Sequence, residues 1–96
     1  MRPSEALSTH RARVRQIALS HRVSNVQVFG SAARGDDAEG SDLDLLVEPT
    51  SETTLFDIGA IRFEVKQLLG VEVDVLTPDA LPDKFRAQVL RDARPL

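Results

Sequence analysis

Two motifs in the first half of the chain combine residue types that can hold metal ions and phosphates. Gly30–Gly35 reads GSAARG, and five residues later Ser41–Val47 reads SDLDLLV. Because successive strand residues point to opposite faces, Asp42 and Asp44 would lie on one face, about 7 Å apart along the chain. A third acid, Asp74, interrupts a later run of valines. If the two strands are neighbours, we expect three carboxylates to meet on one face.

A cluster of three carboxylates needs compensation because like charges repel. Protonation, pairing with arginine or a divalent metal ion could each supply it. Ligand sets made only of oxygen favour Mg²⁺ or Mn²⁺ over zinc. Gly30 and Ser31 offer backbone N–H groups and a hydroxyl at a strand-to-helix turn, where a phosphate could sit. The combination indicates metal-assisted phosphoryl transfer from a nucleotide.

The spacing of apolar residues predicts the elements that must position these motifs. Ser4 is expected to cap the first helix and Gly70 to end the second. The second helix should bury a stripe from Leu55 to Leu69, and the last should turn Phe85, Val89 and Leu90 inward. The predicted helices span about residues 4–20, 53–69 and 82–94, and the predicted strands about 24–29, 43–47 and 71–76.

Composition limits the class of protein. The 96 residues fit one domain, and 42% hydrophobic with 28% charged residues is ordinary for a soluble globular protein. Without cysteine, disulfides and thiolate metal sites are excluded, which favours the cytoplasm. No apolar run approaches the ~20 residues of a membrane span, and no signal peptide is expected. The net charge of -3 argues against direct nucleic-acid binding.

Charge is distributed unevenly along the chain. Six arginines and one acid lie between Arg2 and Arg34, whereas seven acids and no base lie between Asp36 and Glu52. The arginines are interpreted as a solvated helix face that could also meet an acidic partner or a triphosphate. The acids at 36–39 are expected to keep a loop soluble, or to close over a nucleotide.

These motifs together resemble the minimal nucleotidyltransferase (MNT) family of the polymerase beta superfamily. The resemblance extends from about Val26 to Val75. It implies an α/β (α+β) fold, with a small mixed β-sheet backed by helices, over a single domain of residues 1–96. The catalytic core would span about residues 24–76.

The resemblance also implies how metal would be bound. One Mg²⁺ would be held by Asp42, Asp44 and Asp74 beside the acceptor hydroxyl. A second would lie between Asp42, Asp44 and the triphosphate of ATP. The alternative for these acids is a solvated strand edge, in which they would be surface residues without a ligand.

The remaining roles implied by the resemblance concern the phosphates and the proton. Gly30 and Ser31 would bind the outer phosphates, and Asp74 would help to deprotonate the attacking hydroxyl. Arg34 would support the phosphates or the loop. Alternatively, Arg34 caps the segment that follows it or pairs with an acid of residues 36–39.

Within this family the short chain is most similar to antitoxins of MNT/HEPN toxin–antitoxin pairs. That similarity implies transfer of AMP to a tyrosine of a cognate HEPN ribonuclease toxin. Two alternatives are an antitoxin that neutralises its partner by occlusion and an enzyme that modifies a small molecule such as an aminoglycoside. The sequence leaves open the preferred nucleotide, the acceptor residue, the number of transfers, the oligomeric state and the need for catalysis.

Overall fold

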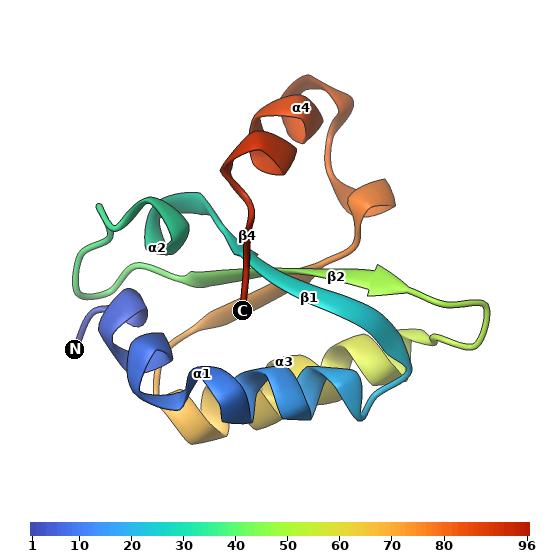
Figure 1. Ribbon diagram of the computed structural model, residues 1–96, viewed down its shortest axis with the longest axis horizontal. Helices are drawn as coiled ribbons and strands as arrows, with labels where there is room; N and C mark the ends of the chain where they lie inside the picture. Colours follow the sequence, from blue (N-terminus) through green and yellow to red (C-terminus); the bar gives the residue numbers. More distant parts are fainter.

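The computed structural model describes all 96 residues as helices packed on one mixed β-sheet (Figure 1). Its elements are α1 (Pro3–Leu19), β1 (Val23–Phe29), α2 (Gly30–Arg34), β2 (Leu43–Pro49), α3 (Leu55–Leu69), β3 (Val73–Leu76), a 3-10 turn (Pro78–Ala80), α4 (Asp83–Asp92) and β4 (Arg94–Pro95). The predicted helices and strands are all present, with ends that differ by one or two residues. Val71, predicted to begin the third strand, precedes β3. None of the helices is long and apolar enough to cross a bilayer.

The sheet has the strand order β3-β2-β1-β4. β1 runs antiparallel to β2 and to the two-residue β4, and β2 runs parallel to β3. Helices α1 and α3 lie side by side on one face of the sheet, while α4 stands over the other face (Figure 1). The predicted mixed sheet backed by helices is therefore confirmed.

The main core lies between the sheet and the α1–α3 layer. Strand alternation sends Leu43, Leu45 and Val47 of β2 into this core, where they meet Ile61 and Val65 of α3. The opposite face carries a second, smaller cluster of Phe29, Leu46 and Leu81, with Val89 of α4 packed against it. The face of the sheet opposite the α1–α3 layer is therefore apolar where α4 packs against it.

Three residues expected to be buried are exposed. Leu55 of α3 is 87% exposed, and Phe85 and Leu90 of α4 are 53% and 51% exposed. Helix α4 rests on a cluster of only three buried residues, which leaves Val89 as its inward apolar contact. Leu55 is the first residue of α3, next to the exposed turn that follows β2. The periodicity of apolar residues predicted these helices, but it could not show how little of each helix surface is buried by the rest of the protein.

The ends of the two long helices are fixed differently. Helix α3 begins at a reciprocal cap in which Thr54 and Asp57 bond each other's backbone N–H, and it ends at Gly70, as predicted. The prediction that Ser4 caps α1 is wrong. Pro3 takes the first helical position, so Ser4 lies inside the helix. Its backbone N–H is free to bond a residue from elsewhere in the chain.

Candidate active site

The strand register brings two of the three predicted aspartates together. Asp44 of β2 is paired with Phe29 of β1 on one side and with Asp74 of β3 on the other. Residues paired in this way across adjacent strands present their side chains on the same face of the sheet. Both carboxylates point away from the α1–α3 layer, because their neighbours Leu45 and Val75 point into the main core. The expectation that β2 and β3 are adjacent is correct.

Asp42 precedes β2 by one residue and completes the acidic group. It and Asp74 are exposed, whereas Asp44 is half-buried. Burial, together with the negative charges of Asp74 and Asp42, raises the pKa of Asp44 to about 6, although the positive charge of Arg34 opposes the rise. The local environment of Asp44 therefore favours a bound proton or a cation.

Glycine at position 30 is required by the same carboxylate. Gly30 has a φ of 71°, a left-handed conformation, and a Cβ built on it would lie 2.5 Å from Oδ2 of Asp44. Only a residue without a side chain lets the backbone after β1 approach Asp44 this closely. The start of α2 and the Asp44 carboxylate therefore lie against each other, as expected for a site in which phosphate and metal bind side by side.

The three carboxylates do not form a preformed metal-binding site. No group of three or more His, Cys, Asp or Glu side chains in this structure has the arrangement needed to hold a metal ion. Asp42, Asp44 and Asp74 nevertheless fit a hard divalent cation in donor type, because they offer only oxygen. Burial and the negative charges of Asp74 and Asp42 raise the pKa of Asp44, so a cation would be favoured beside it.

Arg34 lies at the end of α2 and makes two ion pairs. Its Nε donates to Oδ2 of Asp36 at 3.2 Å, and its Nη1 donates to Oδ2 of Asp92 at 3.2 Å. These two carboxylates raise the pKa of Arg34 above its ordinary value. Pairing with an acid of residues 36–39 was one predicted alternative. The bond to Asp92, which joins α2 to α4, was not predicted, because no local pattern relates residues so distant in sequence.

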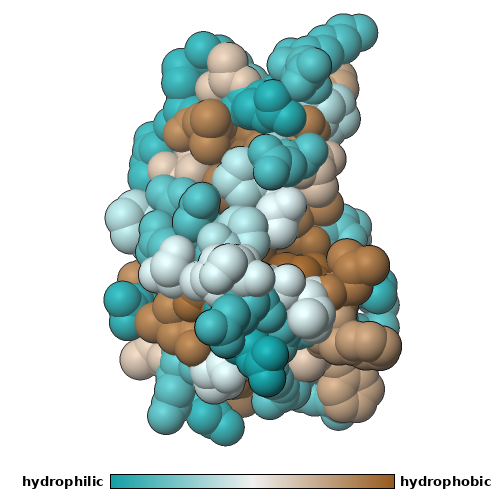
Figure 2. Space-filling model, turned by 90° about the vertical axis from the view of Figure 1, so that its right-hand side faces the viewer, coloured by the Kyte–Doolittle hydropathy of each residue, from teal (hydrophilic) through white to brown (hydrophobic).

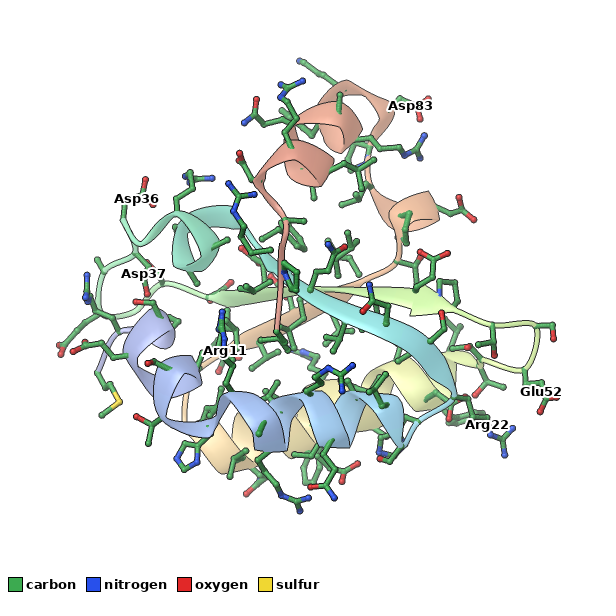
Figure 3. The ribbon with its side chains drawn as sticks, in the orientation of Figure 1. Arg11, Arg22, Asp36, Asp37, Glu52 and Asp83 are labelled. Atoms are coloured by element: carbon green, nitrogen blue, oxygen red, sulfur yellow. The ribbon has the colours of Figure 1, made fainter.

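The loop between α2 and β2 is anchored by a buried acid that sequence reasoning misplaced. Asp37 was expected to be a solvated loop residue, yet it is only 5% exposed. Its Oδ2 accepts a hydrogen bond of 2.8 Å from the backbone N–H of Ser4, in the first turn of α1. Figure 3 shows Asp37 beside that turn, while Asp36 lies at the outer edge of the loop. An acid at a helix N-terminus is stabilised there by the helix dipole.

Burial acts to raise the pKa of Asp37, but hydrogen bonds from Ser4 and from its own backbone outweigh burial and lower it overall. Its Oδ1 is buried without a partner. Further along the loop, Ala38 and Ser41 bond each other, since the Ala38 N–H donates to Oγ of Ser41 and the Ser41 N–H donates to the Ala38 carbonyl, each at 3.0 Å. The loop that leads into Asp42 is therefore held at both of its ends.

The surface hollow of this molecule is not at the aspartates. It lies beside the residues that precede Asp42 in the chain and is lined by Met1, Gly40, Lys66 and Glu72, among others. Neither Asp42 nor the strand aspartates line it. The carboxylates therefore lie on an open face, without a pocket for a small acceptor beside them.

Comparison with known proteins identifies the class to which this fold and site belong. Residues 7–96 match the nucleotidyltransferase domain family, and the chain belongs to it. It is 38% identical over 77 residues to a protein assigned as a protein adenylyltransferase in Methanocaldococcus jannaschii, covering 80% of this chain and 83% of that one. It is 33% identical over 70 residues to the protein adenylyltransferase MntA of Thermococcus cleftensis, covering 73% and 71%. The predicted family resemblance is confirmed, and the chain is a nucleotidyltransferase.

Solved structures agree on the fold. A minimal nucleotidyltransferase that is 45% identical superimposes with a TM-score of 0.78, over 94% of this chain and 95% of that one. A toxin–antitoxin complex with AMP-PNP contains a chain that is 14% identical and superimposes with a TM-score of 0.71, over 97% of this chain and 71% of that chain. The second likeness concerns the fold alone.

Proposed function

We propose that this nucleotidyltransferase transfers AMP from ATP to a tyrosine hydroxyl of a HEPN-domain ribonuclease toxin and thereby acts as its antitoxin. The observation that carries the proposal is the pairing of Asp44 with Asp74 across β2 and β3, with Gly30 against Asp44 and Asp42 at the strand entrance. Relatives named protein adenylyltransferases support the reaction. Fold neighbours in toxin–antitoxin complexes support the kind of partner.

In this proposal Asp42, Asp44 and Asp74 bind two Mg²⁺ ions. Bound there, the ions would neutralise charge on the triphosphate and on the acceptor oxygen. Burial and the charges of Asp74 and Asp42 raise the pKa of Asp44, which supports this assignment, since a cation placed among these carboxylates stabilises the charged form that burial and repulsion disfavour. The cation and the proton compete for the same oxygen atoms.

The chain's own residues would position and deprotonate the reactants. The backbone at Gly30 and the hydroxyl of Ser31 hold the outer phosphates of ATP, and Asp74 accepts the proton of the tyrosine hydroxyl. The hydroxyl oxygen then bonds to the α-phosphorus while the bond from that phosphorus to pyrophosphate breaks. Nη1 of Arg34 donates to Asp92, so this nitrogen contacts the phosphates only by exchanging that bond for one to the nucleotide.

The acceptor is expected to be a macromolecule rather than a small molecule. The aspartates lie on an open face, and the surface hollow is elsewhere. A partner protein brings its own surface to such a site, whereas a small acceptor needs a pocket that surrounds it. This disfavours an aminoglycoside as the acceptor.

The test is intact-mass spectrometry of a HEPN protein incubated with this chain, Mg²⁺ and each nucleoside triphosphate in turn. We expect the mass of one or more AMP groups to be added with ATP, and none to be added by the Asp42→Asn/Asp44→Asn variant. Circular dichroism of the variant controls for folding. An active double variant would refute the assignment of these aspartates.

A second candidate is neutralisation by occlusion, without chemistry. It is favoured by the engagement of Arg34 with Asp36 and Asp92. Under this alternative the wild type adds no mass, and the Asp42→Asn/Asp44→Asn variant still binds the toxin and still suppresses its ribonuclease activity.

A further inference from the structure

Asp42 is the one predicted metal ligand that no strand holds. Asp44 and Asp74 lie within β2 and β3, where the strand register fixes their backbones. Asp42 precedes β2, so the loop that joins α2 to β2 decides where its carboxylate lies. The residue after it is fixed, because the N–H of Leu43 donates to the carbonyl of Glu72 at 2.8 Å. The position of Asp42 therefore depends on what fixes the loop before it.

Asp37 is the only buried residue between α2 and β2. It is 5% exposed, whereas the rest of the loop is exposed except for Ser41, which is half-buried. A carboxylate costs free energy to bury unless its oxygen atoms are hydrogen-bonded. Oδ2 of Asp37 accepts a bond of 2.8 Å from the backbone N–H of Ser4, while Oδ1 has no partner. The bond to Ser4 therefore ties this side chain to α1.

The N–H of Ser4 is free for this bond because of how α1 begins. Pro3 takes the first helical position and has no N–H. The N–H groups of Glu5 and Ala6 both donate to the carbonyl of Arg2. In the first turn of the helix, only the N–H of Ser4 is left for a residue from elsewhere in the chain.

That first turn is fixed to the body of the protein. The side chains of Pro3, Ala6 and Leu7 are buried, and Leu7 belongs to the main core. Buried side chains are close-packed, so they allow little displacement of the backbone that carries them. Asp37 is therefore bound to a rigid part of the molecule rather than to a second loop.

A closed turn connects Asp37 with Asp42. The N–H and the carbonyl of Ala38 are both bonded to Ser41, at 3.0 Å each, and Gly40 supplies a left-handed backbone conformation, with a φ of 88°. Because these bonds close the turn, a shift of Asp37 would move Ser41 and with it Asp42. The contact between Asp37 and α1 therefore bears on the place of the Asp42 carboxylate.

We propose that Asp37 is a positioning residue for the metal ligand Asp42. By accepting the bond from Ser4 it holds the turn at residues 38–41, and this turn places Asp42 at the entrance to β2, the strand of Asp44. The inference rests on the proposed function, in which Asp42 binds a divalent cation. Asp37 does not touch the cation, because its carboxylate is buried and directed toward α1.

The test is Mn²⁺ binding to the full chain without substrate, measured from the electron paramagnetic resonance signal of free Mn²⁺. Binding that Asp42→Asn/Asp44→Asn abolishes defines the site. We expect Asp37→Ala to bind Mn²⁺ about tenfold more weakly than the wild type, as is typical when a group that orients a metal ligand is lost. Asp37→Asn should restore most of the affinity, because its amide oxygen can still accept from Ser4. This rescue separates the geometry of the loop from the loss of a charge.

Asp36→Ala and Glu52→Ala are the matched controls for the lost charge. Asp36 is the preceding acid of the same loop and is exposed. Glu52 is an exposed acid at the end of the molecule opposite the loop, which is the end that Figure 2 shows. Both variants should bind Mn²⁺ nearly as tightly as the wild type, because salt screens exposed charges.

Asp37→Glu keeps the test decisive if Asp37→Ala does not fold, which circular dichroism shows. The charge stays, but the longer side chain does not fit a close-packed position without a shift of the loop, so Mn²⁺ should again bind more weakly. Affinity equal to that of the wild type in whichever of the two variants folds would overturn the inference and leave the proposed function standing. Equal weakening by Asp36→Ala would do the same. A wild type that binds no Mn²⁺ would overturn both the proposed metal role and this inference.

Discussion

Asp44 lies directly opposite Asp74 across the parallel pair of β2 and β3, and burial together with the charges of Asp74 and Asp42 raises its pKa to about 6. The unfolded chain titrates this group near its ordinary value, about 3.9. The folded protein therefore binds the proton more tightly, and its free energy of unfolding falls as pH rises from about 4 to about 6. Above pH 6 the full cost of the charged carboxylate is present.

Asp44→Asn should remove this pH dependence. Without metal, we expect the variant to be about 1–2 kcal/mol more stable than the wild type at pH 8 and equally stable near pH 4. A rise of the pKa from about 3.9 to about 6 corresponds to ~3 kcal/mol, and the partial exposure of Asp44 reduces this by solvent screening. Urea unfolding in EDTA at the two pH values measures the difference. An equal difference at both pH values would contradict the crowding of charge.

Mg²⁺ should stabilise the wild type through the same carboxylates. A ligand that binds only the folded state adds about 2.7 kcal/mol when present at a hundred times its dissociation constant. We expect Mg²⁺ to raise the thermal midpoint of the wild type at pH 8, less so at pH 5, and not to raise that of Asp42→Asn/Asp44→Asn. Differential scanning calorimetry measures the shift without any need for a substrate.

Gly30→Ala should damage the site more than the fold. The new methyl group would meet Asp44 at 2.5 Å in addition to the left-handed strain of about 1–2 kcal/mol. Gly70→Ala is a close control, since Gly70 has a φ of 70° but open space around it. We expect Gly30→Ala to lose at least as much stability as Gly70→Ala, and only Gly30→Ala to lose at least tenfold in transfer activity and in Mg²⁺ affinity.

Asp37→Ala should loosen the loop that precedes Asp42. Removing a buried acceptor leaves the Ser4 N–H without its partner, at a cost of about 1–3 kcal/mol in the free energy of unfolding. The pKa of Asp37 is lowered on folding, so this contribution is present above pH 4 and is lost as pH falls through the folded value. Asp36→Ala, at an exposed position, should behave like the wild type in urea unfolding. Equal stability of the two variants would contradict the anchoring role of Asp37.

Asp92→Asn should free Arg34 from α4. If Arg34 contacts the triphosphate, its release should lower the KM for ATP several-fold with little change in kcat, while Arg34→Gln should raise KM. Asp83→Asn is the control, because Asp83 lies on the same helix but pairs with Arg86. Steady-state kinetics separates the parameters, and an unchanged KM in Asp92→Asn would place Arg34 outside the phosphate site.

The elements of this fold could be predicted because their signals are local. Alternation in Leu43–Val47 and the helical stripe around Ile61 and Val65 state which side of each element is apolar. The same patterns could not predict how much of each helix surface packs against the rest of the protein. Leu55 and Phe56 of α3 are apolar but exposed, because the burial of a helix depends on its neighbours.

The features of the candidate site likewise fall into those that the sequence predicts and those that only the folded structure shows. By itself the sequence predicted Asp42 and Asp44 on one face and a glycine directly after the first strand, because strand period and turn chemistry are properties of short segments. Its motifs also resembled those of nucleotidyltransferases. Only the tertiary structure decided that Asp74 lies beside Asp44, that Asp37 is buried at the start of α1, and that Arg34 is bound to Asp92. Each of these contacts joins segments remote in sequence, and only the folded chain brings their charges together.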